Sequence, residues 1–569
     1  MLSVKIVKWS PGKFLKPHYL FLYFTLLPLI VNQQFNGAMK IILSISFFVI
    51  SCFTLTGKDG YMRNTSADII HYDFSISISD TSNIIYGHAS ITVNFTGAVS
   101  SIGFDLKNRG ADEKGMTVQY LTFDKGLVKW VHKNNRIDIT FDDSIKAGSQ
   151  GIFTIDYSGV PADGLIISEN KYGKRTYFAD NWPDRARNWL PCVDHPYDKA
   201  TVDFNITSPD HYQVVGSGYL IEESCMPNHT KLTHWKEDVP LATKVMAIGV
   251  APFAARLEGN VYGVPVWSWV FSENRKQGFY DYSVGVKPLA FFSRLIGPYP
   301  YEKLANVQSR TIFGGLENAG CIFYAENSVT GQGNDENLMA HEIAHQWFGN
   351  SVTENDWHHI WLSEGFATYL TAVFQEKTYG KEKSDETMKS ARDRVIGFSL
   401  RSSKPVVDTT ITDLMKLLNP NSYQKGAWVL HMLRHEIGDD LFWKGMRLYY
   451  EEYKNKNALT SDFQNVMEAV SNRNLEYFFK QWLFVAGEPD LKITTGPEER
   501  KEYTEVTIEQ TQENLFRFDI ELQIRDSNGS QIIKIPVSDR ITKKILRIGK
   551  ILEIIPDPNI NLLFRRVGE

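Results

Sequence analysis

Residues 341–364, HEIAHQWFGNSVTENDWHHIWLSE, decide how this chain is organised. His341 and His345 are four positions apart. On a helix this spacing puts two side chains on one face, one turn apart, so that both imidazoles can reach one metal ion. Zinc is commonly bound by histidine nitrogen and carboxylate oxygen, and a catalytic zinc keeps three protein ligands and one open position. The stretch therefore predicts a helix that supplies two ligands of a zinc ion.

The third ligand is expected from the start of a second helix. Glu364 follows His345 by 19 residues, and the loop between the two helices is long enough to bring them side by side. His358 and His359 are competing ligands in principle, but adjacent residues of a loop point apart, which favours packing or hydrogen-bonding roles for both. Glu342 flanks the same site and is not needed as a ligand, so it is placed to act as a general base.

Composition excludes several classes of protein. The chain has 569 residues, 43% of them hydrophobic and 13% aromatic, which is enough to build large cores. The net charge of −5 lacks the basic excess of most nucleic-acid-binding proteins, so no nucleic-acid partner is expected. Four scattered cysteines form neither a disulfide framework nor a CxxC zinc motif. Any metal must then be held by histidine and carboxylate.

The first 67 residues are interpreted as a signal or anchor region and a linker. Residues 40–52, KIILSISFFVISC, combine a basic start, a short apolar run, a small residue and Cys52, which resembles a bacterial lipoprotein signal. A plain secretory signal or an apolar anchor within residues 19–50 are the alternatives. We expect an exported protein, periplasmic or attached to the cell envelope, with Met39 as the start on the lipoprotein interpretation.

Three sections follow, and together they predict a multidomain α+β protein. Residues 68–260 alternate apolar and polar positions in short runs, as in an antiparallel β domain. Residues 261–488 change to helical spacing and predict a mainly α catalytic domain, with helices over 336–348, 363–379, 423–437 and 461–470. Residues 489–569 return to alternation and predict a C-terminal β-sandwich.

Several motifs in order resemble one family. The spacing of His341, His345 and Glu364 is that of the gluzincin zinc metallopeptidases, and the chain is similar to the family of aminopeptidase N and the leukotriene-epoxide hydrolase. Residues 314–318, GGLEN, match the family's Gly-x-Met-Glu-Asn segment except for Leu316, and residues 423–426, YQKG, match its tyrosine motif. Further matches are residues 191–196, PCVDHP, residues 297–300, GPYP, and Gln481-Trp482.

The resemblance covers residues 68–569 and implies a fold, a cofactor and roles for individual residues. It implies a thermolysin-like catalytic domain with one Zn²⁺ per chain, in a short form without the large helical C-terminal domain of many members. It also implies that Glu317 binds the free α-amine of the substrate, that Gly314 and Gly315 let backbone approach the substrate, and that Tyr423 donates a hydrogen bond to the oxyanion. Asp180 is the candidate for a second polar partner from the β domain.

The expected function is hydrolysis of the N-terminal residue from peptides, with Glu342 as general base. The expected partners are peptides with a free N-terminus and a membrane, reached through a lipid or the N-terminal apolar segment, and a monomer is expected. An epoxide hydrolase-like activity and a catalytically inactive binding protein remain as alternatives.

Overall fold

The computed structural model describes residues 59–496, 503–548 and 550–568. Cys52 and the predicted signal or anchor segment lie outside these residues. None of the helices within the described ranges is both long and apolar enough to cross a membrane.

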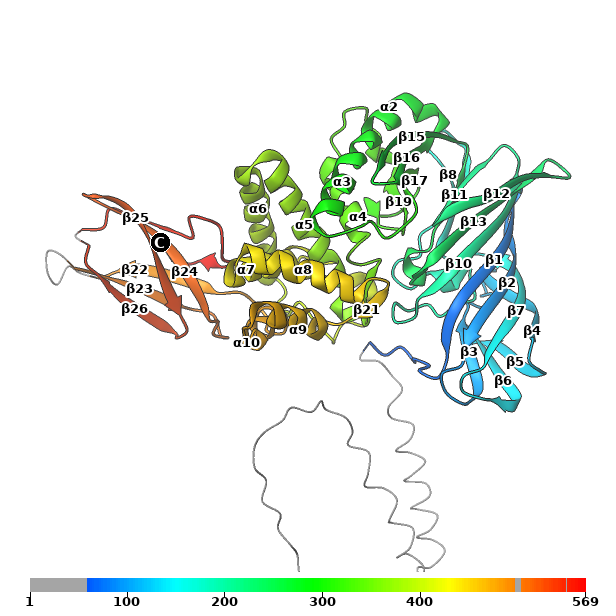
Figure 1. The fold of residues 1–569 in the computed structure, drawn as a ribbon, viewed down its shortest axis with the longest axis horizontal. Coiled ribbons are helices and arrows are strands. Elements are labelled where there is room, and N and C mark those ends of the chain that lie inside the picture. Colours follow the sequence, from blue (N-terminus) through cyan, green and yellow to red (C-terminus); the bar gives the residue numbers. More distant parts are fainter. Residues whose placement is uncertain (1–58, 497–502, 549, 569) are drawn as a thin grey trace, which may run out of the picture. The chain divides into compact units, whose positions relative to one another are not determined.

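The first section is built from strands, as its alternation predicts. Its largest sheet has seven strands in the order β12-β13-β10-β1-β2-β7-β4, where β1 and β10 run parallel and the other neighbours antiparallel (Figure 1). On β1, Tyr72, Phe74 and Ile76 are buried and alternate with more exposed polar residues. The strands of this section are β1 (Asp68–Ser79), β2 (Ser82–Asn94), β3 (Val99–Asp105), β4 (Gly115–Phe123), β5 (Val128–Lys133), β6 (Arg136–Ile145), β7 (Gln150–Val160), β8 (Leu165–Glu169), β9 (Arg175–Ala179), β10 (Ala200–Pro209), β11 (Gln213–Gly216), β12 (Tyr219–Met226), β13 (Thr230–Leu241) and β14 (Ile248–Ala251).

A five-stranded sheet opens the catalytic section and was not expected from the sequence pattern. It has five strands in the order β15-β16-β17-β19-β18, and it crosses the predicted boundary at residue 260. Nearly every residue of β17 and β19 is buried, so these strands lack the alternation that marks a half-exposed strand. The strands are β15 (Phe253–Val261), β16 (Val264–Phe271), β17 (Leu304–Ser309), β18 (Gly315–Leu316) and β19 (Cys321–Ala325).

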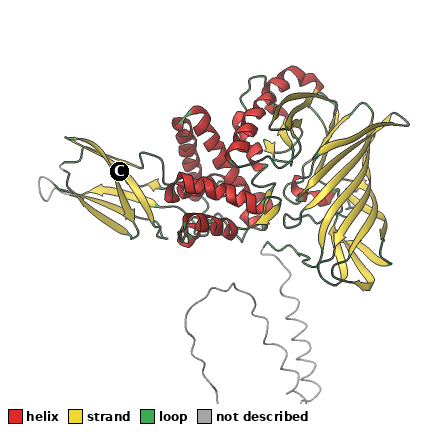
Figure 2. Cartoon of the chain, viewed as in Figure 1, coloured by secondary structure: helices red, strands yellow, loops and turns green. Residues whose placement is uncertain are grey.

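The α-helices of the described residues all fall between residues 275 and 483 (Figure 2). Each of the four predicted helices has a counterpart close to its expected position, namely α4, α5, α7 and α9, whereas α2, α3, α6, α8 and α10 were not predicted. The helices are α2 (Arg275–Tyr282), α3 (Val286–Leu295), α4 (Glu336–His345), α5 (Trp361–Tyr379), α6 (Lys381–Ser399), α7 (Gly426–Ile437), α8 (Asp439–Tyr453), α9 (Thr460–Ser471) and α10 (Glu476–Leu483). A short parallel pair, β20 (Val352–Glu354) and β21 (Lys456–Ala458), joins two loops of this section.

The last section contains two sheets, one of four strands in the order β26-β23-β22-β28 and one of three in the order β25-β24-β27. Its strands are β22 (Asp490–Thr495), β23 (Thr504–Gln510), β24 (Phe518–Asp526), β25 (Gly529–Val537), β26 (Ile541–Leu546), β27 (Glu553–Pro556) and β28 (Arg565–Arg566). Arg392 of α6 donates to Asp557 at 2.6 Å, which ties this section to the helices.

Candidate active site

The two predicted histidine ligands face each other at the end of α4. Their Nε2 atoms are 3.1 Å apart. The Nδ1 atom of His345 lies 3.3 Å from the backbone oxygen of Phe348, which can only accept a hydrogen bond. Nδ1 of His345 therefore carries a hydrogen, which leaves Nε2 as the atom that can bind a metal once it has lost its own proton.

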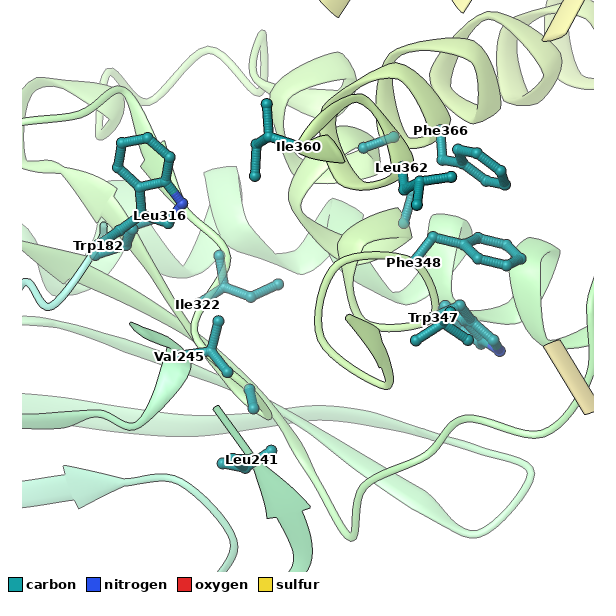
Figure 3. Packing of buried hydrophobic residues seen from close by; sticks show 14 of the residues in the cluster. Trp182, Leu241, Val245, Leu316, Ile322, Trp347, Phe348, Ile360, Leu362 and Phe366 are labelled. Carbon is teal, nitrogen blue, oxygen red and sulfur yellow. The ribbon is translucent and has the colours of Figure 1, made fainter. Parts of the chain in front are cut away.

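Glu364 completes the group from the first turn of α5. Its Oε2 atom lies 3.4 Å from Nε2 of His341 and 3.3 Å from Nε2 of His345. The ends of α4 and α5 are held together by packing of Phe348 against Phe366, whose ring centroids are 4.9 Å apart (Figure 3). The structure thus brings all three predicted ligands to one point.

The charge of this group suits a divalent cation. Oε2 of Glu364 is buried and has no hydrogen-bond partner within the described ranges. Burial lowers the pKa of His345, but the carboxylates of Glu364, Glu317 and Glu342 outweigh it and raise that pKa to about 9. Even with Glu342 favoured in its neutral form, the carboxylates of Glu364 and Glu317 exceed the positive charge of the two imidazoles and leave an excess of negative charge. A zinc ion bound by His341, His345 and Glu364 would neutralise that excess, so the residues present fit the metal.

Glu342 lies beside the three ligands and is almost fully buried. Burial raises the pKa of its carboxyl group well above the ordinary value, and the negative charges of Glu317 and Glu364 raise it further. Gly315 leaves the room that this side chain needs, because a Cβ at position 315 would lie 2.2 Å from Oε1 of Glu342. Gly314 borders open space, with no atom within 4 Å of a Cβ built there. A side chain at position 315 would therefore displace Glu342, whereas a side chain at position 314 would only fill the open space beside it.

Glu317 follows the short edge strand β18. Its Oε1 atom is buried and has no hydrogen-bond partner in the part of the chain that is described. Gln346 and Asn350 fix its backbone, since their side-chain amides donate to the carbonyl oxygen of Glu317 at 2.9 and 2.6 Å. Neither residue was predicted from the sequence, although Gln346 directly follows the second histidine.

Tyr423 reaches the site from a π-helical turn, Asn421–Lys425, that leads into α7. Its ring stacks on His341 with centroids 6.1 Å apart. Burial raises the pKa of the phenol well above its usual range, and the carboxylates of Glu364 and Glu317 add to this. The hydroxyl is therefore protonated at neutral pH and able to donate.

A close helix contact supports this position of Tyr423. A Cβ on Gly365 would lie only 2.9 Å from Cα of Gly426. The backbones of α5 and α7 therefore approach each other directly at these two glycines. Glu364 precedes one of the glycines, and Tyr423 lies three residues before the other.

Asp180 is placed differently from the three carboxylates of the centre. It is fully buried and ion-paired with Arg185, and its Oδ2 accepts from the Thr311 hydroxyl at 2.9 Å and the Ile312 backbone amide at 3.1 Å. Both of its oxygens are engaged within the protein. The contacts tie the β domain to the segment that precedes Gly314. An amine-binding role for Asp180 stays a prediction that these contacts do not favour.

His358 and His359 point to other partners, as expected. His358 contacts Asp356 at 2.9 Å and the carbonyl oxygen of Ile411 at 3.1 Å, and His359 contacts the Thr460 hydroxyl at 2.7 Å. Ser363, which was not singled out, lies 3.0 Å from Nδ1 of His345 and helps to orient that ring.

Comparison with protein families gives two matches. Residues 69–245 match the Peptidase M1 N-terminal domain, and residues 280–482 match the Peptidase family M1 domain. Glutamyl aminopeptidase of Rattus norvegicus is 25% identical over 456 residues, which cover 75% of this chain and 48% of that protein. Endoplasmic reticulum aminopeptidase 2 of Homo sapiens is 28% identical over 362 residues, which cover 61% and 36%. The chain spans about half or less of the length of these relatives.

Solved structures give a consistent result. The M1 zinc metallopeptidase from Deinococcus radiodurans matches with a TM-score of 0.63 and 25% identity, over 73% of this chain and 93% of that one. A mutant of that metallopeptidase bound to a Tyr-Ser-Ala substrate matches with a TM-score of 0.64 and 25% identity, over 74% and 94%.

Proposed function

Since the chain belongs to the M1 peptidase family, we propose that it is a zinc-dependent aminopeptidase that removes the N-terminal residue from peptides. The observation that carries the proposal is the convergence of the His341, His345 and Glu364 ligand atoms, all within 4.8 Å of one another, beside the buried Glu342. The solved structure with a bound tripeptide supports a peptide as the substrate class.

The residues of the chain divide the chemistry among them. When bound, a zinc ion supplies a water molecule of lowered pKa and polarises the scissile carbonyl. Glu342 accepts the proton of the attacking water and passes it to the leaving amine. Tyr423 donates its hydroxyl proton in a hydrogen bond to the oxygen that becomes negative in the tetrahedral intermediate. Glu342 is buried and Tyr423 is half-buried, which limits the contact of both side chains with bulk water.

Glu317 determines where the chain is cut. Its unpartnered carboxylate oxygen is suited to the substrate's ammonium group, and this ion pair would fix the scissile bond one residue from the N-terminus. Gly314 contributes by leaving space beside the segment that leads to Glu317.

The variant Glu342→Gln tests the assignment. It should keep about one zinc ion per chain at the catalytic centre and lose at least roughly a hundredfold in kcat on an aminoacyl p-nitroanilide, because the general base is gone while the ligands remain. Metal analysis and a chromogenic assay measure both quantities. Zinc lost together with activity would contradict the role of Glu342. A wild-type enzyme with zinc but no amidase activity would favour the epoxide hydrolase or inactive alternatives.

We also propose, from the sequence alone, that the protein is exported and attached to the membrane through Cys52. The variant Cys52→Ser should then move the protein from the membrane fraction to a soluble or unprocessed form. Unchanged attachment on fractionation would favour an uncleaved apolar anchor.

A further inference from the structure

A second group of metal-ligating side chains lies on the outer face of the seven-stranded sheet, in a different domain from the zinc group. It consists of His71 and Asp73 on β1 and Asp203 on β10. Residues two apart on a strand share a face, and Asp73 and Asp203 are directly paired across the two parallel strands. One potential ligand atom from each of the three lies within 4.8 Å of the other two.

Each of these side chains is held by a neighbour through one atom, which leaves another atom for a ligand. The Thr201 hydroxyl donates to the carbonyl oxygen of Ile70 at 3.1 Å, so at 2.7 Å it accepts from Nδ1–H of His71. The lone pair of His71 is then on Nε2. Such an outer hydrogen bond typically fixes the tautomer of a metal-binding histidine.

Each of the two carboxylates is likewise held by a neighbouring side chain through one of its oxygens. Asn205 donates to Oδ1 of Asp73 at 2.9 Å, and Nε2 of His234 lies 3.0 Å from Oδ2 of Asp203. Oδ1 of Asp203 is buried and has no hydrogen-bond partner in the described part of the chain. A buried carboxylate oxygen without a partner is costly unless a cation or a donor meets it.

The negative charges of Asp73 and Asp203 also favour a bound cation. Like charges directly opposite each other on neighbouring strands are destabilising. Within the described ranges no Lys or Arg is ion-paired with Asp73 or Asp203, and Lys236, which is opposite Asp203 on β13, pairs with Asp238 at 3.1 Å. A hollow of about 590 Å³, lined in part by Asp73 and Asn205, borders the group on the side of Asp73.

We propose that His71, Asp73 and Asp203 form a second divalent-cation site that takes a first-row transition metal such as Zn²⁺ or Mn²⁺. One imidazole with two carboxylates suits these ions better than Ca²⁺, which prefers six to eight oxygen ligands. Ligand atoms that each lie about 2.1 Å from one ion are about 3 to 4 Å from one another. The three side chains, which are partly exposed, would therefore move toward one another by about 1 Å when the ion binds. This site is independent of the peptidase centre and of the function proposed for it.

Zinc content of the whole protein tests the proposal. After equilibration with Zn²⁺ and removal of excess, wild type should contain one zinc ion per chain more than Asp203→Asn. The matched control is Asp156→Asn, which removes the carboxylate of the His88–Asp156 pair on the same sheet face. It should keep the full wild-type content. Aminopeptidase activity should be the same in all three proteins, because none of these residues belongs to the peptidase centre.

A second measurement covers the case in which the site fills only at higher zinc concentration. Raising Zn²⁺ after the catalytic site is full should raise the thermal unfolding midpoint of wild type and Asp156→Asn but not that of Asp203→Asn, since only a folded site binds the ion. Equal zinc content and equal thermal shifts in wild type and Asp203→Asn would overturn the proposal. Displacement of the extra zinc by millimolar Ca²⁺ would overturn the choice of metal class.

Discussion

Two acidic side chains predicted to contact the substrate differ in how they are held. Oε1 of Glu317 is buried without a hydrogen-bond partner in the described part of the chain, whereas the carboxylate of Asp180 is occupied by Arg185, Thr311 and Ile312. A buried carboxylate oxygen that the fold leaves unpaired costs free energy, which a substrate ammonium can recover. Glu317 therefore has the environment of an amine-binding residue, and Asp180 has that of a residue that positions a loop.

The variant Glu317→Ala tests whether Glu317 binds the free amine of the substrate. Loss of one partner of a buried charge pair costs roughly 2 to 5 kcal/mol, so kcat/KM for free-amine substrates should fall by about 30-fold or more. Zinc content should not change, because Glu317 is not one of the three ligands. Paired assays on free and N-acetylated peptides measure the effect. Equal cleavage of both by wild type would instead indicate an endopeptidase.

At the scale of elements, the sequence predicted the parts of the site that depend on local spacing. The four-residue spacing of His341 and His345 requires only a helix, and α4 supplies it. Glu364 was found because it opens the next helix, α5. Two partners of Asp180 could not be predicted, since Thr311 and Ile312 lie more than 130 residues away in the chain and meet it only through tertiary packing.

The five-stranded sheet of the catalytic section was missed for a related reason. Period-two alternation identifies a strand only when one face is exposed, and every residue of β17 is buried. The helices α6 and α8 also escaped the pattern analysis, although each is flanked by a glycine, Gly380 or Gly438, with positive φ. Alternation in the sequence thus predicts the half-exposed strands of residues 68–251 better than the buried strands of the catalytic section.

The glycine contact between α5 and α7 gives a prediction at this scale. Gly365→Ala places a Cβ 2.9 Å from Cα of Gly426 and should push the two helices apart. We expect a loss of about 1 to 3 kcal/mol in stability, together with lower kcat, because Glu364 and Tyr423 lie on the two displaced elements. Denaturant unfolding and the chromogenic assay measure the two effects.

The matched control for that substitution is Gly397→Ala in α6, where a Cβ meets no atom within 4 Å. It should be neutral or slightly stabilising, because alanine favours a helix interior by up to about 1 kcal/mol. If both variants behaved alike, the close approach of α5 and α7 would not be what positions the site.

At the scale of the whole molecule, ionic and polar contacts join the three sections. Lys244, from the β domain, forms a buried ion pair with Glu354 of β20. Lys199 donates to the carbonyl oxygens of Asn350 and Ser351 at 3.0 and 2.7 Å. The C-terminal sheets contact the helices through Arg392 and Asp557 and through His431 of α7. Because several of these side chains ionise, the strength of the contacts between the three sections depends on pH.

The titration of His431 determines how one of these contacts changes stability with pH. Its Nε2 lies 2.8 Å from the carbonyl oxygen of Ile560, and burial, with the nearby His435, lowers its pKa from 6.5 to about 3. Between these values the unfolded chain binds a proton that the folded chain does not. The free energy of unfolding is therefore unaffected by His431 above about pH 6.5, and it falls as the pH drops toward 3, by on the order of 5 kcal/mol.

The variant His431→Gln should reduce this acid sensitivity. Glutamine can still donate to the carbonyl oxygen of Ile560 but does not gain a proton, so the drop in thermal midpoint between pH 7 and pH 4.5 should be smaller than in wild type. The control is His229→Gln, whose histidine side chain is 95% exposed, and it should leave the drop unchanged. Acid-induced loosening of the C-terminal sheets from α7 should be visible as proteolysis near Ile560 in wild type at pH 4.5. An unchanged drop in His431→Gln would mean that carboxylates elsewhere, and not this joint, set the acid limit of the fold.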